Sequence, residues 1–178
     1  GSKLSPPALS ALAPGLYVVA TPIGNSRDIT LRALDLLAAA DIVACEDTRT
    51  TGKLLFLHGI SAPLTAYHDH NAQRVRPALL ARLQRGEAVV LVSDAGTPLI
   101  SDPGYRLVVE AQAAGIPVTT APGPSAPIAA LTISGLPTDR FFFAGFLPPK
   151  RAAPRAAPPP SPSSAPPPLP SPPPPPHP

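Results

Sequence analysis

Short apolar runs alternate with segments of helical periodicity over residues 15–146, and this alternation limits the possible folds more than any other feature. Strands that alternate with helices of about 10–15 residues predict a parallel α/β sheet with right-handed crossovers. Residues 88–92 are apolar throughout, which is typical of a parallel strand that is buried on both faces. We expect strands at residues 16–20, 42–45, 64–67, 88–92, 118–120 and 141–146.

Capping residues and glycines mark the ends of the helices that we expect between these strands. The first helix has leucines at helical spacing over residues 31–37, with Asp28 or Thr30 as its N-cap. We expect Asp102 to cap a later helix and Pro103 to be the first residue of that helix. The other expected helices lie at residues 48–58, 71–85 and 125–134, and glycines at 59, 86, 115 and 135 end the last four helices.

Proline is unevenly distributed along the chain, because residues 151–178 hold 15 of the 30 prolines. This tail, rich in proline, alanine and serine, is expected to be disordered or locally in the polyproline II conformation. We therefore divide the chain into a flexible leader, an N-terminal α/β domain, the beginning of a second α/β domain, and the tail. Their expected ranges are 1–14, 15–121, 122–150 and 151–178.

The formal net charge of +3 arises at the end of the chain. Without Lys150, Arg151 and Arg155, 11 basic residues balance 11 acidic ones, so composition alone does not indicate a nucleic-acid surface. No apolar run approaches the roughly 20 residues of a membrane span, and no secretory signal is visible. The lone Cys45 excludes a disulfide scaffold and is interpreted as a small buried hydrophobic residue. We expect a cytoplasmic protein without a membrane partner.

Polar turns rich in glycine and proline follow four of the expected strands, after Ala20, Cys45, Val92 and Thr120. The carboxyl ends of parallel strands meet at one edge of a sheet, and ligands bind in the crevice beyond that edge. The first turn, residues 21–25, has one glycine where a dinucleotide-binding fingerprint needs three, and no P-loop motif is present. On its own this turn is weak evidence for a ligand site and is better explained as a change of chain direction.

The third turn, residues 93–104, is long for a connection between a strand and a helix. Gly96 permits close approach of the backbone to a ligand, and Pro98 stiffens the loop. Asp94 could accept hydrogen bonds from a ribose or face a cation, and the alternative is a structural Asx-turn. In the fourth turn, Ser125 lies at a helix N-terminus that could hold a carboxylate or phosphate, and the alternative role is an N-cap.

Two further motifs carry chemically useful side chains. Glu46, Asp47 and Arg49 follow the second expected strand, where paired carboxylates beside an arginine suit the orientation of a hydroxyl nucleophile. The alternative is a helix-capping acid pair with a surface ion pair. His68 and His70 resemble metal ligands, but a single cysteine and no third nearby histidine argue against zinc. We expect a substrate contact or an ordinary loop there.

Taken together, the motifs resemble one family in order and spacing. They lie at residues 15–25, 28–34, 45–49, 67–71, 93–104 and 122–126. Over about residues 15–150 the sequence resembles the ribosomal RNA small subunit methyltransferase I family, within the tetrapyrrole methylase superfamily. Members of that family use S-adenosyl-L-methionine to methylate the 2′-hydroxyl of a cytidine in the decoding centre of 16S rRNA.

The resemblance implies a two-domain fold of tetrapyrrole methylase type, with the cofactor in the cleft between the domains, and a homodimer. It implies catalytic roles for Glu46, Asp47 and Arg49, with Glu46 or Asp47 assisting deprotonation of the 2′-hydroxyl. It implies substrate contacts by Asn25, His68 and His70, and no metal. The cofactor-binding residues that it implies are Pro22, Gly24, Asp94, Ala95, Gly96, Pro98, Leu99, Ser125 and Ala126.

The sequence departs from the family pattern after Lys150, where the family continues with a basic helical segment and more strands. We hypothesise a truncated or frameshifted product with impaired cofactor binding and activity. Two other functions stay open: a methylase of a small tetrapyrrole-type molecule, and a non-catalytic fragment whose tail binds an SH3- or WW-type partner through residues 167–170. The motifs at residues 46–49 and 68–70 favour the rRNA branch over the small-molecule methylases.

Overall fold

Five parallel strands form a sheet with the order β3-β2-β4-β1-β5, in a computed structural model that describes residues 11–98 and 103–145. These residues belong to one compact unit, Gly1–Gly145. The strands are β1 (Gly15–Val19), β2 (Ile42–Cys45), β3 (Leu64–Ala66), β4 (Ala88–Leu91) and β5 (Val118–Ala121). The helices are α1 (Leu31–Ala39), α2 (Thr48–Leu57), α3 (Ala72–Gln84), α4 (Gly104–Ala113) and α5 (Ala126–Ser134). The expected α/β fold with a parallel sheet is confirmed.

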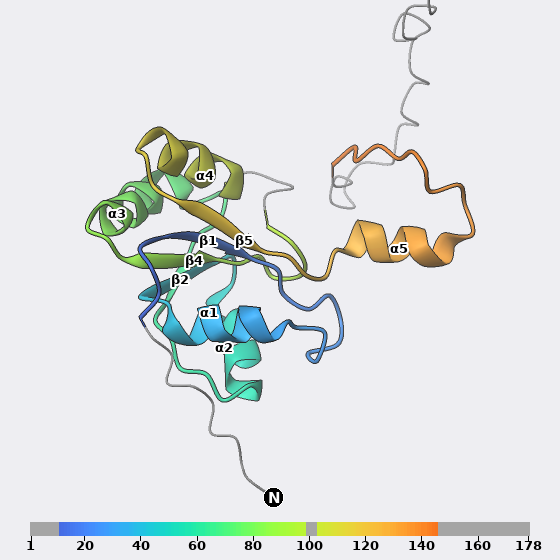
Figure 1. Cartoon of the computed structure of the whole chain (residues 1–178), viewed down its shortest axis with the longest axis horizontal. Helices are drawn as coiled ribbons and strands as arrows, with labels where there is room; N and C mark the ends of the chain where they lie inside the picture. Colours follow the sequence, from blue (N-terminus) through green and yellow to red (C-terminus); the bar gives the residue numbers. More distant parts are fainter. Residues whose placement is uncertain (1–10, 99–102, 146–178) are drawn as a thin grey trace, which may run out of the picture. The chain divides into compact units, whose positions relative to one another are not determined.

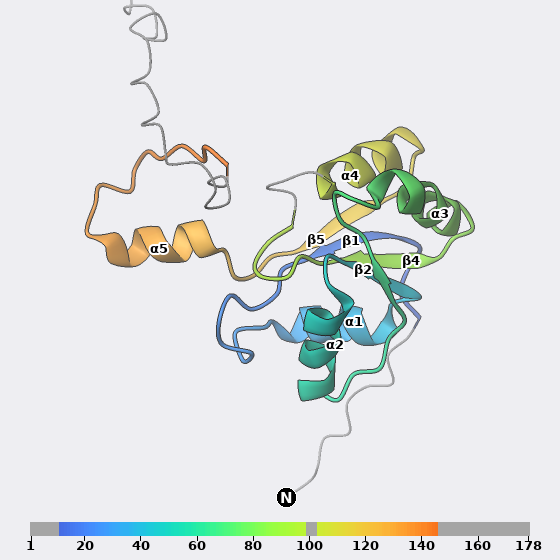
Figure 2. The same ribbon diagram turned by 180° about the vertical axis from the view of Figure 1, so that it is seen from behind.

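Helices cover both faces of the sheet, with α1 and α2 on one face and α3 and α4 on the other (Figures 1 and 2). The strand β4 is apolar throughout because its side chains are buried on both faces of the sheet. Val89 packs in a cluster with Leu107 of α4, whereas the next residue, Val90, packs in a cluster with Leu37 of α1. All four of these side chains are fully buried, as expected for a central parallel strand.

The helix ends agree with most of the capping predictions. Thr30 is the N-cap of α1, because its Oγ1 accepts a hydrogen bond of 3.0 Å from the Ala33 N–H, so Asp28 is not the cap. The prediction for α4 was wrong by one residue: Pro103 is the N-cap and Gly104 is the first helical residue. Asp102, the expected cap, lies outside the described residues. Positive φ angles at the helix ends occur at glycines 59, 86, 115 and 135.

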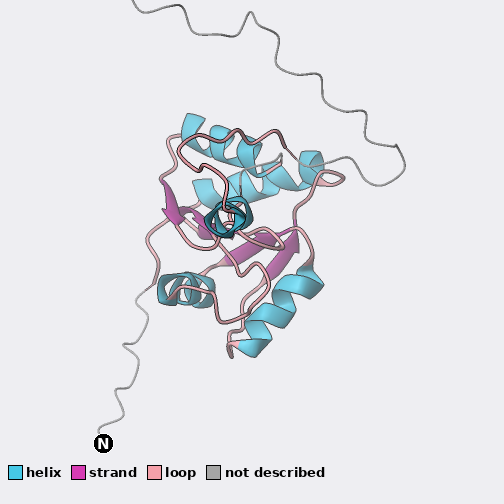
Figure 3. Cartoon of the chain, turned by 90° about the vertical axis from the view of Figure 1, so that its right-hand side faces the viewer, coloured by secondary structure: helices cyan, strands magenta, loops and turns pink. Residues whose placement is uncertain are grey.

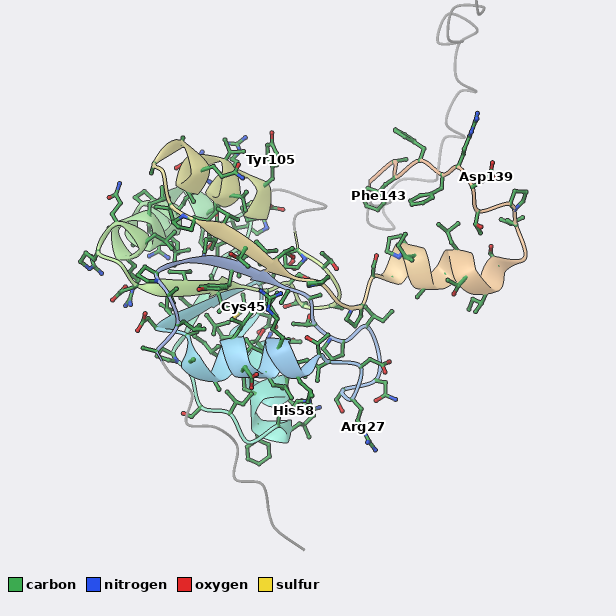
Figure 4. All side chains as sticks on the ribbon, viewed as in Figure 1. Arg27, Cys45, His58, Tyr105, Asp139 and Phe143 are labelled. Atoms are coloured by element: carbon green, nitrogen blue, oxygen red, sulfur yellow. The ribbon has the colours of Figure 1, made fainter. Side chains whose placement is uncertain are left out.

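The sixth strand, expected at residues 141–146, is not present in the described part of the chain. Residues 141–145 have no regular structure (Figure 3), and residue 146 lies outside the described ranges. The apolar run predicts a strand only if a partner strand is available, and none of the described strands pairs with it. Its aromatic side chains, including Phe143, lie on the segment after α5 (Figure 4), and Phe142 is 90% exposed.

The helix α5 has no buried residue, although most of its residues are apolar. The domain boundary expected between residues 121 and 122 stays a prediction, and so does the division into leader, second domain and tail. The tail and most of the leader lie outside the described residues. Within the described ranges, no helix has the length and apolar character that crossing a bilayer requires.

Candidate functional site

Three of the polar turns meet beyond the carboxyl ends of the strands. Thr21, which follows β1, exchanges two backbone hydrogen bonds with Gly96, at N···O distances of 2.9 and 3.0 Å. The Thr97 Oγ1 donates a hydrogen bond of 3.0 Å to the Pro124 carbonyl oxygen, just before α5. The loop after β4 therefore contacts both the turn after β1 and the turn after β5.

Two glycines permit this close approach. Gly96 has a φ of +85°, and a Cβ there would lie 3.4 Å from the Ile23 side chain. A Cβ on Gly123 would lie 3.1 Å from the Cβ of Ala20, closer than about nine in ten real contacts of this kind. The left-handed φ at Gly96 therefore disfavours any other residue there, and a side chain at Gly123 would require Ala20 to shift by a few tenths of an ångström.

Asp94 connects the loop after β4 to the start of α2. Its Oδ1 accepts a hydrogen bond of 3.0 Å from the backbone N–H of Asp47. Asp47 is in turn the N-cap of α2, since its Oδ1 accepts from the Arg49 N–H at 2.8 Å. The side chains of Asp47 and Arg49 also form an ion pair of 3.1 Å.

Hydrogen bonds from Arg49 lower the pKa of Asp47, so this carboxylate stays ionised at neutral pH. The capping alternative for Asp47 is therefore correct in the structure, and it does not exclude a role in the site.

A pocket of about 280 Å³ opens at this edge of the sheet. Three residues expected to bind the cofactor, Pro22, Gly24 and Asp94, are among those that line it, as are Thr21 and Ser93 of the same turns. A Cβ on Gly24 would meet no atom within 4 Å, so this glycine leaves free space at the pocket wall. The remaining lining residues are Ser26, Thr50, Thr51, Lys53, Leu54 and Leu57.

The wall formed by α2 was missed in the sequence. Thr50, Lys53, Leu54 and Leu57 recur at three- and four-residue intervals along α2, so they share one face of the helix, and this spacing was the signal that could have found them. The end of α2 contacts the residue that follows the first turn, because the Nε2 of His58 lies 2.9 Å from the Ser26 carbonyl oxygen. His58 and the neighbouring turn at Arg27 are labelled in Figure 4.

Several of the expected site residues do not line this pocket. Asn25 is exposed, and its Oδ1 accepts a hydrogen bond from the Arg27 N–H at 3.0 Å. Ser125 occupies the N-cap position of α5, but its side chain makes no capping hydrogen bond. Leu99 lies outside the described residues. The others outside the lining are Glu46, Asp47, Arg49, His68, His70, Ala95, Gly96, Pro98 and Ala126.

Glu46 and His68 lie within electrostatic reach of one another, at the ends of β2 and β3. Partial desolvation raises the pKa of Glu46, and the nearby charges of Asp94 and Asp69 raise it further, while His68 opposes this shift. The Nδ1 of His68 is buried and has no hydrogen-bond partner. The ring of His68 lies 5.9 Å from that of His70, in an edge-to-face arrangement.

The raised pKa of Glu46 gives a prediction about stability. Because the pKa of Glu46 is higher in the folded state, protonation of this carboxylate favours folding. The stabilisation by the protonated form is complete at pH values below the unfolded-state pKa. It is lost as the pH rises through the folded-state pKa. We expect Glu46→Gln to raise the melting temperature by about 1 °C near pH 7, with the difference vanishing near pH 4, since this carboxylate is exposed. Thermal melts across this pH range would measure it. An Asp35→Asn variant on α1 serves as control, and a lower melting temperature for Glu46→Gln at pH 7 would contradict the prediction.

The described residues contain no group of three or more histidine, cysteine, aspartate or glutamate side chains that could hold a metal ion. Cys45 is buried, and desolvation raises the pKa of its thiol, so it is held as a neutral thiol.

A family model for tetrapyrrole (corrin/porphyrin) methylases matches residues 15–159. The chain belongs to this family. Among curated relatives, the chain is 67% identical over 139 residues to the ribosomal RNA small subunit methyltransferase I of Mesorhizobium japonicum. It is 58% identical over 142 residues to the protein of the same name from Escherichia coli O157:H7. These matches cover 78% and 80% of this chain but 47% and 50% of the relatives, so the chain spans about half of their length.

Solved structures support the same family. The chain is similar to the crystal structure of uroporphyrin-III-C-methyltransferase from Thermus thermophilus, with a TM-score of 0.53 and 26% sequence identity. That match covers 68% of this chain and 52% of the solved chain. The resemblance inferred from the motifs is therefore confirmed, both by the family and by the named relatives.

Proposed function

We propose that this methylase transfers a methyl group from S-adenosyl-L-methionine to the 2′-hydroxyl of a cytidine in the decoding centre of 16S rRNA. The proposed partner is the small ribosomal subunit in the cytoplasm, and the proposed assembly is a homodimer. The names of the curated relatives, at 58% and 67% identity, support the substrate class.

The observation that carries the proposal is the hydrogen bond between Asp94 Oδ1 and the Asp47 N–H. Asp94 belongs to the loop proposed to bind the cofactor, and Asp47 belongs to the motif proposed to act on the substrate. This bond of 3.0 Å joins the two groups of residues directly. Transfer of a methyl group between two bound molecules needs such proximity of donor and acceptor sites.

The residues present fit the proposed cofactor in chemical kind. S-adenosyl-L-methionine supplies, when bound, a methyl group on a positively charged sulfur. The free space beside Gly24 leaves room for a ligand at the pocket wall. The carboxylate of Asp94, at the same pocket, would suit a ribose or a positive charge. Backbone groups of the loop at Gly96 and the start of α5 at Ser125 would complete the proposed cofactor side.

Glu46 is the better candidate for the group that accepts the hydroxyl proton. The carboxylate of Asp47 is occupied by the cap of α2 and by Arg49, which holds its pKa low. The carboxylate of Glu46 has a raised pKa, which makes it a stronger base than the carboxylate of Asp47. Arg49, with a side chain 91% exposed, and the turn that carries His68 and His70 are proposed to contact the substrate, together with Asn25.

A second candidate function is methylation of a small tetrapyrrole-type molecule, because the similar solved structures are named as uroporphyrin-III-C-methyltransferases. The identity of 26% to that enzyme, against 67% to an rRNA methyltransferase, makes this the weaker proposal. The third possibility, partner binding by the tail, lies outside the described residues.

Methyl transfer from radiolabelled S-adenosyl-L-methionine would decide between the two substrates. Small ribosomal subunits from cells that lack this modification are incubated with the full chain, and uroporphyrinogen III is offered in parallel. We expect label in a single cytidine of these subunits, and none in subunits from wild-type cells, whose 16S rRNA already carries the methyl group. Label only in the tetrapyrrole, or in neither substrate, would overturn the proposal.

A further inference from the structure

Tyr67, directly after β3, is a buried residue with a polar role that the proposed mechanism does not use. It is only 2% exposed, and its hydroxyl donates a hydrogen bond of 3.0 Å to the carbonyl oxygen of Pro103, the N-cap of α4. Its backbone N–H donates to the Cys45 carbonyl oxygen at 2.7 Å. Tyr67 therefore joins the ends of β2 and β3 to the start of α4.

The Tyr67 side chain also contacts an ion pair between Arg76 and Glu110. Arg76 of α3 forms a side-chain hydrogen bond with Tyr67. This hydrogen bond is the main cause of the raised pKa of the Arg76 guanidinium. The Nε of Arg76 also lies 2.8 Å from the Oε1 of Glu110 on α4. The Arg76 side chain is 12% exposed and that of Glu110 is 45% exposed, so solvent reaches the ion pair mainly at Glu110. A guanidinium that donates to the phenol oxygen strengthens the phenol as a donor to Pro103.

The turn that carries both substrate-side histidines begins next to Tyr67. We name residues 68–71 the 68–71 turn. Asn71 closes it from the other end, because its Oδ1 accepts from the His68 N–H and its Nδ2 donates to the Ala66 carbonyl oxygen, each at 2.9 Å. Asn71 thus fixes the turn to β3, whereas Tyr67 fixes it to α4.

We propose that Tyr67 is a positioning residue, which holds the 68–71 turn in register with α4 and so keeps the His68 imidazole in place beside Glu46. The role of the histidines in this inference rests on the proposed function. The hydrogen bonds that support the inference are independent of that function. Tyr67 acts through His68 and does not itself touch the reacting atoms. Because the Tyr67 hydroxyl contacts both the Pro103 carbonyl oxygen and the Arg76 side chain, removal of this one oxygen atom is expected to move the turn.

The first test compares Tyr67→Phe with the wild-type full chain by NMR of the histidine side chains and the Asn71 side-chain amide. We expect the His68 and Asn71 signals to shift in Tyr67→Phe. The matched control is Tyr17→Phe, which removes a hydrogen bond of 2.7 Å from a tyrosine hydroxyl to the Ala13 carbonyl oxygen. That control should leave both signals unchanged. Unchanged His68 and Asn71 signals in Tyr67→Phe would overturn the proposal.

A second variant covers the case in which Tyr67→Phe does not fold. Glu110→Gln weakens the same network from its exposed end, where the substitution is easily tolerated. It is expected to shift the same two signals in the same direction by a smaller amount. No shift in a folded Glu110→Gln chain would then count against the proposal.

The kinetic test separates positioning from a general loss of stability. On small ribosomal subunits, Tyr67→Phe is expected to lower kcat/KM about fivefold, as for the loss of one hydrogen bond, while the Kd for S-adenosyl-L-methionine changes less than about twofold. In a His68→Ala background, Tyr67→Phe should have no further effect. Additive losses, or a parallel loss of cofactor affinity, would overturn the proposal. Absence of transfer by the wild-type chain would contradict the proposed function alone, since the NMR result does not depend on it.

Discussion

Replacement of Asp94 by asparagine is expected to weaken binding of S-adenosyl-L-methionine by about 10- to 100-fold, because it removes a charge-assisted contact at the pocket wall. Asparagine keeps an oxygen that can accept from the Asp47 N–H, so the link between the loop and α2 should survive. Asp94→Ala removes the link as well and is expected to lower methyl transfer further. Calorimetric titration of the full chain with the cofactor measures the first effect.

Asp41→Asn is a matched control for this measurement. Asp41 also accepts a hydrogen bond from a backbone N–H, that of Ala88, at 2.7 Å. It does so at the amino end of β4, whereas Asp94 lies beyond the carboxyl end of the same strand. We expect cofactor affinity in Asp41→Asn to equal that of the wild type. Equal affinity in wild type and Asp94→Asn would remove Asp94 from the proposed cofactor site.

Truncation of Leu37 to alanine is expected to lower the free energy of unfolding by about 2–5 kcal/mol, the largest stability effect that we predict. Leu37 is fully buried and packs in the cluster between α1 and the sheet, so its removal leaves a cavity that the neighbouring strands cannot close. Leu31→Ala, on the same helix, removes a side chain that is 81% exposed and should change the free energy by less than about 0.5 kcal/mol. Denaturant unfolding compares them, and equal losses would show that α1 does not pack as described.

The sequence predicts the elements of this fold well because each has a local physical signal. The apolar run of β4 reports burial on two faces, and Thr30 and the glycines at helix ends report caps and left-handed turns. The order of the strands has no such signal, because β1 pairs with β4 and β5, which lie far along the chain. The expected strand at residues 141–146 shows the limit: an apolar run does not specify its partner.

The candidate site was predictable as an edge of the sheet but not as a set of contacts. The rule for parallel strands placed the turns at Thr21, Asp94 and Ser125 at one edge. The bond from the Asp47 N–H to Asp94 uses a backbone donor, which no side-chain pattern reveals. The wall formed by α2 was missed because residues such as Lys53 and Leu57 resemble an ordinary helix surface until a pocket is found beside them.

The pairing of β1 has a consequence for biosynthesis. Among the described strands β1 is translated first, yet in the described sheet its hydrogen-bonding partners are residues 88–91 and 118–121. While the nascent polypeptide grows, the backbone N–H and C=O groups of β1 therefore lack their strand partners until β4 and β5 have left the ribosome. During that interval the apolar segment is a target for chaperones and for aggregation, and slower synthesis before residue 88 would prolong it.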